Sequence, residues 1–143
     1  MMIVNELAKK SGVNSNTIRY YTKIGLLEPH RDRINGYKLF QPEDVHKLKF
    51  ISKAKELGFT LNHIKEMLSR VTQGEMVCDL AREQIVKNIV ECESEIVALT
   101  EKKRKMESAL EQWEKLPGEL PNADVWCHLI ENHNTGENDR DAE

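Results

Sequence analysis

The fold is decided by the stretch Asn16-Thr17-Ile18-Arg19-Tyr20-Tyr21, which follows a short helical pattern and a glycine. Residues 3–10 place apolar side chains at helical spacing, and Gly12 marks a turn. Asn14 or Ser15 can then cap a second helix that runs through Tyr21. Two short helices joined by a tight turn indicate a helix-turn-helix, although many helical pairs share this spacing.

A basic hairpin signal lies downstream, in Arg31-Asp32-Arg33-Ile34-Asn35-Gly36-Tyr37-Lys38-Leu39-Phe40. Asn35-Gly36 is a strong signal for the turn of a hairpin, and cationic residues flank it on both sides. A basic hairpin after a helix-turn-helix predicts a wing. We expect Phe40 to pack the wing onto the helices, whereas packing and a surface role are equally open for Tyr37.

Two further helices are expected after the wing. Gln41-Pro42-Glu43-Asp44 starts the first of them, because proline and acidic residues suit the first turn of a helix. Gly58 ends this helix and Thr60 can cap the next. The predicted buried stripe of the first helix consists of Val45, Leu48, Phe50, Ile51, Ala54 and Leu57.

After Gly74 the apolar spacing alternates between four and three residues, which is the heptad pattern of a coiled coil. A helix from about residue 78 to 114 would be roughly 50 Å long, too long to bury its seam against a small first domain. A second copy of the same helix is the expected partner. The seam residues are Ile85, Ile89, Cys92, Ile96, Leu99, Lys103, Met106, Leu110 and Trp113, with Cys92 expected to act as a small buried hydrophobe.

Charge divides the 143-residue chain into halves that suit different partners. Residues 1–70 carry 13 Lys and Arg against 7 Asp and Glu, whereas residues 71–143 carry 8 against 17. The basic half can neutralise phosphates, and the acidic half is better suited to a partner chain or a ligand. No apolar run approaches the roughly 20 residues that span a bilayer, which predicts a cytoplasmic protein with no membrane partner. No set of nucleophile, base and orienting residue supports an enzyme.

The basic half is therefore expected to bind double-stranded DNA, with the second helix of the helix-turn-helix in the major groove. Donors on this helix can meet base edges, and cations and hydroxyls around the wing can contact the phosphate backbone. The expected groove residues are Asn14, Asn16, Thr17 and Arg19. The expected backbone contacts are Tyr20, Tyr21, Arg31, Arg33, Tyr37 and Lys38.

We predict a mainly α fold in four parts. Residues 1–74 form a winged helix-turn-helix DNA-binding domain, and residues 75–115 form a long antiparallel coiled-coil dimerisation helix. Residues 116–133 form a C-terminal effector segment, in which a loop precedes a short helix at 125–130. Residues 134–143 are polar and acidic, and we expect this tail to be disordered.

The order of these features resembles the MerR family of transcriptional regulators. The resemblance rests on Thr17-Ile18-Arg19-Tyr20-Tyr21, on the wing with Asn35-Gly36-Tyr37, on Cys78 before a long helix and on the terminal Cys127 segment. It covers nearly the whole chain except the tail. It implies a homodimer that binds an overlong promoter spacer and, on binding an effector, untwists and bends the DNA so that RNA polymerase engages both promoter elements.

The C-terminal features are similar to the metal-sensing branch of that family. There, a cysteine at the start of the dimer helix of one protomer faces a cysteine-bearing loop of the other, and Cys78 and Cys127 match these positions. Thiolates with an imidazole bind zinc, cadmium, lead or mercury strongly, and His128 and His133 are the candidate additional ligands. In this family a cysteine at the position of Cys78 is associated with divalent ions. The chain departs from the branch because residues 113–124 contain no cysteine.

Other uses of the cysteines stay open at this point. The three cysteines, Cys78, Cys92 and Cys127, are an odd number in a chain without an export signal, so we expect reduced thiols rather than disulfides. A thiol-based redox or electrophile sensor of the same fold is the main alternative to a metal sensor. Simple packing of Cys78 and Cys127, an architectural protein without an inducer, and a regulator that binds an organic ligand are the others.

Overall fold

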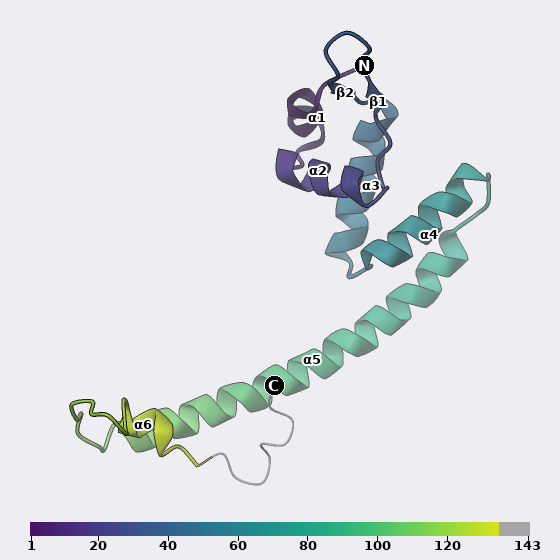
Figure 1. Cartoon of the computed structure of the whole chain (residues 1–143). Coiled ribbons are helices and arrows are strands. Elements are labelled where there is room, and N and C mark those ends of the chain that lie inside the picture. Colours follow the sequence, from purple (N-terminus) through teal and green to yellow (C-terminus); the bar gives the residue numbers. More distant parts are fainter. Residues whose placement is uncertain (135–143) are drawn as a thin grey trace. The chain divides into compact units, whose positions relative to one another are not determined.

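The computed structural model describes residues 1–134, which divide into two compact units within one long helix, between residues 91 and 92. The order of elements is α1 (Val4–Ser11), α2 (Ser15–Lys23), β1 (His30–Arg31), β2 (Lys38–Leu39), α3 (Glu43–Glu56), α4 (Leu61–Thr72), α5 (Cys78–Trp113) and α6 (His128–Glu131) (Figure 1). The predicted tail lies almost entirely outside the described residues.

The helix-turn-helix is formed by α1 and α2. Gly12 ends α1 in the left-handed conformation, with φ of 76°, which glycine adopts without steric cost. Asn14 caps α2, because its Oδ1 accepts hydrogen bonds from the backbone N–H of Asn16 and Thr17. The sequence left Asn14 and Ser15 as alternative caps, and the structure selects Asn14.

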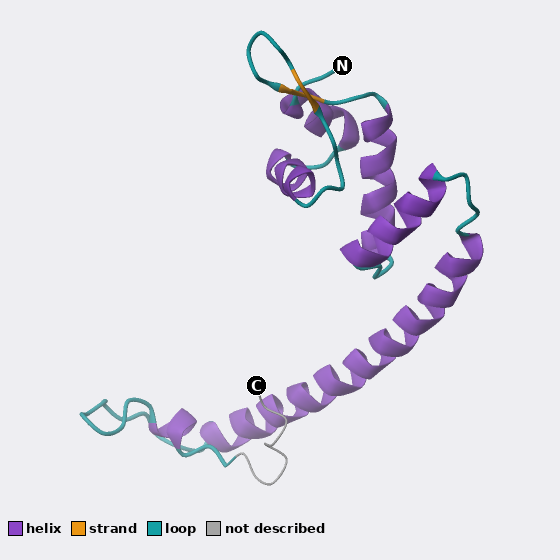
Figure 2. Cartoon of the chain, turned by 45° about the vertical axis from the view of Figure 1, so that its right-hand side comes forward, coloured by secondary structure: helices purple, strands orange, loops and turns teal. Residues whose placement is uncertain are grey.

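The wing is the two-stranded sheet β1–β2, seen in orange in Figure 2. His30 pairs with Leu39 and Arg31 pairs with Lys38, so the connecting loop has six residues, 32–37. The turn predicted at Asn35-Gly36 lies within this loop, where Gly36 has φ of 73°. The backbones of Met2 and Phe40 exchange two hydrogen bonds, which tie the base of the wing to the start of the chain.

The core of the first unit joins α1 to α4 and the wing. Its fully buried large side chains are Leu7, Ile18, Leu27, Phe40, Leu48, Ile51 and Ile64. Phe40 thus packs as predicted. The predicted buried stripe of α3 is wrong at Leu57, which is 58% exposed because the chain turns into the α3–α4 connection there.

The first turns of α5 complete this core. Leu80, Ala81 and Ile85, with Val77 just before the helix, are half-buried and pack against it. Thr60 begins α4 with a reciprocal cap, in which its hydroxyl accepts from His63 N–H and His63 Nδ1 accepts from Thr60 N–H. The start of α5 is therefore part of the same compact unit as the helix-turn-helix.

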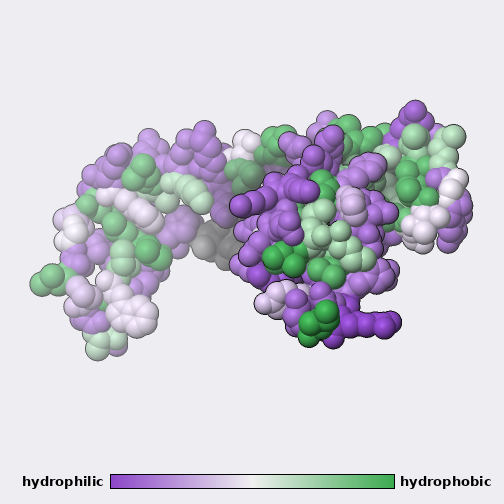
Figure 3. All heavy atoms as spheres, turned by 90° about the horizontal axis from the view of Figure 1, so that it is seen from above, coloured by the Kyte–Doolittle hydropathy of each residue, from purple (hydrophilic) through white to green (hydrophobic). Residues whose placement is uncertain are grey.

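The remainder of α5 carries an apolar surface, as the heptad pattern predicted. Its exposed large apolar residues include Val86, Ile89, Val90, Ile96, Val97, Leu99, Met106 and Leu110. On the face of the molecule that Figure 3 shows, hydrophobic residues, in green, reach the surface among hydrophilic ones, in purple. Cys92 is also exposed in the single chain, so its burial in a dimer stays a prediction.

The short helix α6 is smaller than the predicted helix at 125–130. It contains only His128–Glu131, because Cys127 is extended, with φ of −140° and ψ of 106°. Side chains rather than helical carbonyls accept the N–H groups of residues 124–127. These oxygens satisfy donors that have no carbonyl partner at the start of a helix.

Candidate nucleic-acid interface and metal centre

The exposed face of α2 presents the polar side chains that the sequence predicted for DNA. Asn14, Asn16 and Arg19 are exposed and Thr17 is half-buried. Arg19 Nη1 donates to Asn16 Oδ1 at 3.1 Å, so the two side chains lie together on the same face of the helix. This face offers guanidinium and amide donors, the groups that read acceptors on base edges.

The neighbouring tyrosines Tyr20 and Tyr21 have different environments. Tyr20 is 51% exposed, whereas Tyr21 is 9% exposed and belongs to the hydrophobic core. Burial and the nearby Tyr20 raise the pKa of Tyr21 above its ordinary value. The ring of Tyr21 is thus a packing element, and its predicted contact with DNA stays a prediction.

The wing presents Arg31, Arg33, Tyr37 and Lys38, all of them exposed. Arg31 Nη1 donates to the Gly36 carbonyl at 2.9 Å, a hydrogen bond that links β1 to the wing loop. Arg33 and Lys38 form no salt bridge with any residue in the described part of the chain. Their charges are therefore available to phosphates.

The predicted metal ligands are divided between the two units. Cys78 is exposed and is the first residue of α5, in the first unit. Cys127 is half-buried and precedes α6 in the second unit, followed directly by His128. Within residues 1–134, no group of three cysteine, histidine or acidic side chains could hold a metal ion.

The imidazole of His128 is held by the loop that precedes it. Its Nε2 lies 2.9 Å from the carbonyl oxygen of Pro117. Because a carbonyl only accepts, Nε2 carries the proton in this hydrogen bond, and in the neutral imidazole Nδ1 is then the nitrogen with a lone pair. Metal-bound histidines commonly have this arrangement, with one nitrogen on the metal and the other donating to a backbone carbonyl.

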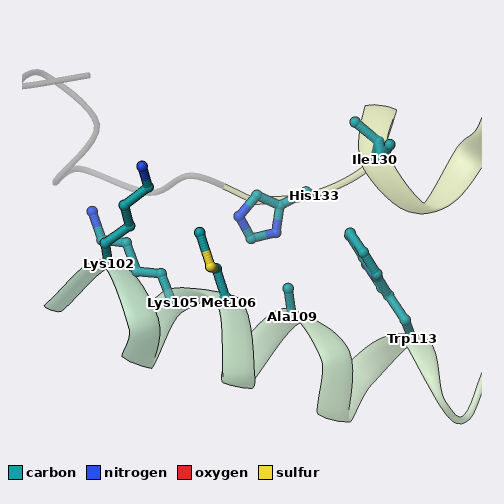
Figure 4. A pocket seen from close by; sticks show the side chains of 7 residues that line it. All are labelled: Lys102, Lys105, Met106, Ala109, Trp113, Ile130 and His133. Atoms are coloured by element: carbon teal, nitrogen blue, oxygen red, sulfur yellow. The ribbon is translucent and has the colours of Figure 1, made fainter. Parts of the chain in front are cut away.

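His133 lies elsewhere in the second unit, at a cavity of about 300 Å³ between the end of α5 and the segment around α6. Figure 4 shows His133 above Met106, with Ile130 facing Trp113. The lining is mainly apolar, and Ala109 beneath it is buried. The cavity residues are Lys102, Lys105, Met106, Ala109, Trp113, Ile130 and His133.

Sequence reasoning missed two side chains that shape the loop around Cys127. Asn122 Oδ1 accepts from the N–H groups of Asp124 and Val125, both at 2.8 Å. Glu131 Oε2 accepts from those of Trp126, at 2.7 Å, and Cys127, at 2.8 Å. In the sequence, only their positions could have indicated these roles: Asn122 lies two residues before Asp124, and Glu131 lies four residues after Cys127.

Three features define a winged DNA-binding regulator. They are a helix-turn-helix with donors on its second helix, a cationic wing, and a long helix with an exposed apolar face. Family models agree: "MerR HTH family regulatory protein" matches residues 2–71, and "MerR, DNA binding" matches residues 45–109. The chain belongs to the MerR family of transcriptional regulators. It is therefore a regulator and not an enzyme, as the sequence predicted.

Two curated relatives and one solved structure illustrate the similarity. The ZntR regulator of Escherichia coli is 30% identical over 132 residues, which are 92% of this chain and 91% of ZntR. The mercuric resistance operon regulatory protein of Bacillus cereus is 46% identical over 76 residues, 52% of this chain and 57% of that protein. The crystal structure of MerR from Bacillus megaterium with mercury(II) has a TM-score of 0.53 and 28% identity, covering 92% of this chain and 98% of that one.

No helix in residues 1–134 combines the length and the apolar character that crossing a membrane requires.

Proposed function

We propose that this chain is a homodimeric, metal-responsive transcriptional regulator that binds a promoter operator and activates transcription by distorting the DNA. The effector is a divalent thiophilic ion of the zinc, cadmium, lead or mercury type. The observation that carries the proposal is a pair of free thiols. Cys78 begins α5, and Cys127 lies after the loop that follows this helix. The apolar face of α5 is exposed in the single chain.

The dimer supplies what one chain lacks. The exposed apolar residues of the heptad seam need a partner, and an antiparallel copy of α5 matches their spacing. These residues are Ile89, Ile96, Leu99, Met106 and Leu110. Antiparallel pairing brings Cys78 of one protomer toward the C-terminal loop of the other. The metal then bridges two chains, so its occupancy can alter the geometry of the dimer.

The donor set fits a thiophilic metal. Cys78 and Cys127 supply thiolates, and His128 Nδ1 is free for coordination while Nε2 is held by Pro117. His133 is the other candidate ligand. When bound, the ion would act as a crosslink between soft sulfur ligands of the two chains. The relatives named for zinc and for mercury support a metal effector, and the choice among the ions belongs to this proposal.

The DNA side of the proposal uses α2 and the wing. Asn14, Asn16, Thr17 and Arg19 read the major groove, while Tyr20, Tyr21, Arg31, Arg33, Tyr37 and Lys38 contact the backbone. The operator lies within a promoter, so RNA polymerase is the further partner. To activate, the metal must bind the DNA-distorting conformation more tightly than the repressing one, because equal affinity shifts no equilibrium.

The test is metal stoichiometry and affinity on the reduced, full-length dimer. Zinc, cadmium, mercury and Cu(I) are titrated against wild type, Cys78→Ser and Cys127→Ser, with Cys92→Ser as the matched control. We expect tight divalent binding, one ion for each pair of Cys78 and Cys127, lost in the first two variants and kept in the third. Absence of tight binding by wild type would discard the metal effector.

A thiol-based redox or electrophile sensor is the second candidate, and the position of Cys78 favours it. This thiol is exposed at the N-terminal end of a 36-residue helix, so oxidants and electrophiles can reach it. Regulation that responds to oxidants in the absence of metal, and is lost in Cys78→Ser, would support this candidate.

A further inference from the structure

Four consecutive backbone N–H groups in front of α6 are held by two side-chain oxygens. Asn122 Oδ1 accepts those of Asp124 and Val125, and Glu131 Oε2 accepts those of Trp126 and Cys127, all within 2.8 Å. The Glu131 bonds are charge-assisted, the stronger class of hydrogen bond. The loop before Cys127 is therefore shaped by its own side chains, without a partner chain.

The Glu131 carboxylate acts on the backbone at Cys127 itself. Cys127 is the N-cap residue of α6 and is extended. The N–H groups at the start of a helix have no carbonyl partner within the helix, and that of Cys127 is one of them. Glu131 accepts this N–H and that of the preceding residue together. The carbonyl oxygen of Cys127 in turn accepts the backbone N–H of Glu131 at 3.0 Å. The peptide groups on both sides of Cys127 are therefore held by Glu131, which fixes the direction of the Cys127 Cα–Cβ bond and so the region that its thiol can reach.

We propose that Glu131 is the positioning residue of Cys127: its carboxylate holds the loop so that the thiol is presented for metal binding. The inference rests on the proposed function of Cys127 as a ligand. Ligands must be held within about 0.5 Å of their productive geometry, and the residues that orient them matter nearly as much as the ligands. With no cysteine in residues 113–124, Cys127 is the only loop thiol to be placed.

A direct role of Glu131 as a metal ligand predicts a different outcome from a positioning role. Glutamine retains a side-chain oxygen that can accept both N–H groups but lacks the negative charge that makes a carboxylate a ligand. Glu131→Gln should therefore preserve positioning, whereas Glu131→Ala should remove it. Glu119→Ala is the matched control, because Glu119 is an exposed carboxylate of the same loop with no described hydrogen bond.

The experiment is a cadmium(II) competition titration of the reduced, full-length dimer, followed by the thiolate-to-cadmium charge-transfer absorbance. We expect Glu131→Ala to weaken cadmium binding by roughly tenfold or more, with an altered absorbance band. Glu131→Gln and Glu119→Ala should remain close to wild type, and the urea midpoint should not change. Wild-type affinity in Glu131→Ala, or equal losses in the Gln and Ala variants, would overturn the inference.

A second readout does not depend on metal. In a Cys78→Ser/Cys92→Ser background, Cys127 is the only thiol, and its rate of alkylation by iodoacetamide reports how it is held. Glu131→Ala should change this rate several-fold, whereas Glu131→Gln should not. If wild type binds no cadmium, the metal effector fails, but the alkylation rates still decide: equal rates in all variants would overturn the role of Glu131.

Discussion

The side-chain amide of Asn88, on α5, donates a hydrogen bond to the backbone carbonyl of Leu57 at the end of α3, with an Nδ2–O distance of 3.0 Å. Gln84, one turn earlier, donates to Asn88 Oδ1 at 3.1 Å and orients that amide. Together with the packing of Leu80 and Ile85, this joins the start of α5 to the helices of the DNA-binding domain. These contacts would therefore transmit a movement of the start of α5 to α3.

Gly58 is the residue that lets Asn88 approach. Its φ is +88°, and a Cβ at this position would lie 3.3 Å from Asn88 Nδ2. Gly58→Ala should lower the free energy of unfolding by about 1–2 kcal/mol, because an L-residue is strained in this conformation. Urea unfolding measures it. Gly118→Ala is the control, since Gly118 has no positive φ and open space around it; equal effects would contradict the strain argument.

Much of the first unit could be predicted because its signals are local. Gly12, Asn14 and Thr60 are cap residues whose chemistry acts within a few residues of the chain, and the heptad spacing alone indicated a helix as long as α5. Leu57 shows the limit of such reasoning. Periodicity placed it on the buried stripe of α3, but the helix ends at Glu56, and the turn that follows exposes it.

The candidate site was less predictable, for two physical reasons. The loop before α6 is shaped by Asn122 and Glu131, whose hydrogen bonds to the backbone leave no periodic pattern in a sequence. In the proposed metal site the donors come from two chains, and an arrangement across two chains leaves no pattern in the sequence of one. For Tyr21 the motif predicted a DNA contact, which stays a prediction, but did not predict that this ring would belong to the core.

Asn14 combines a structural role with a predicted DNA contact, and two substitutions separate them. Asn14→Ala removes the cap of α2 and should destabilise the protein by about 1 kcal/mol, whereas serine retains a capping oxygen. We therefore expect Asn14→Ser to keep the urea midpoint of wild type. If Asn14 also reads a base, Asn14→Ser should still weaken operator binding; unchanged affinity in a gel-shift titration would restrict Asn14 to capping.

Arg19 should carry sequence-specific recognition. Asn16 Oδ1 holds its guanidinium on the exposed face of α2, which orients the donors before DNA arrives. Arg19→Ala should weaken operator binding by about 1–3 kcal/mol and relax specificity at the contacted base pair. Arg104→Ala is the control, because Arg104 lies on α5 and pairs with Glu101. Equal operator affinity of Arg19→Ala and wild type at moderate salt would reject the assignment.

Lys38 should act on all DNA sequences alike. It stands on β2 of the wing, exposed, with no salt bridge to a described residue, so its ammonium can replace a counterion at a phosphate. Lys38→Ala should weaken binding to operator and random DNA similarly and reduce the slope of log affinity against log salt by about one. Fluorescence anisotropy between low and moderate salt measures the slope, with Lys102→Ala, on α5, as the control. A loss confined to the operator would instead assign Lys38 to base recognition.

Tyr21 should make the stability of the first unit sensitive to alkaline pH. Burial raises its pKa in the folded state above the ordinary value of 10.0, so the unfolded state releases the phenolic proton first. The stability that the neutral Tyr21 hydroxyl contributes is complete below pH 10.0. It is lost as the pH rises through the folded-state pKa, because ionisation then favours unfolding.

Tyr21→Phe removes this pH-dependent contribution while keeping the ring in the core. Urea midpoints measured from neutral to alkaline pH should therefore fall more steeply for wild type than for Tyr21→Phe, and Tyr20→Phe, at an exposed site, should follow wild type. Parallel curves for wild type and Tyr21→Phe would show that the buried hydroxyl does not control the alkaline limit.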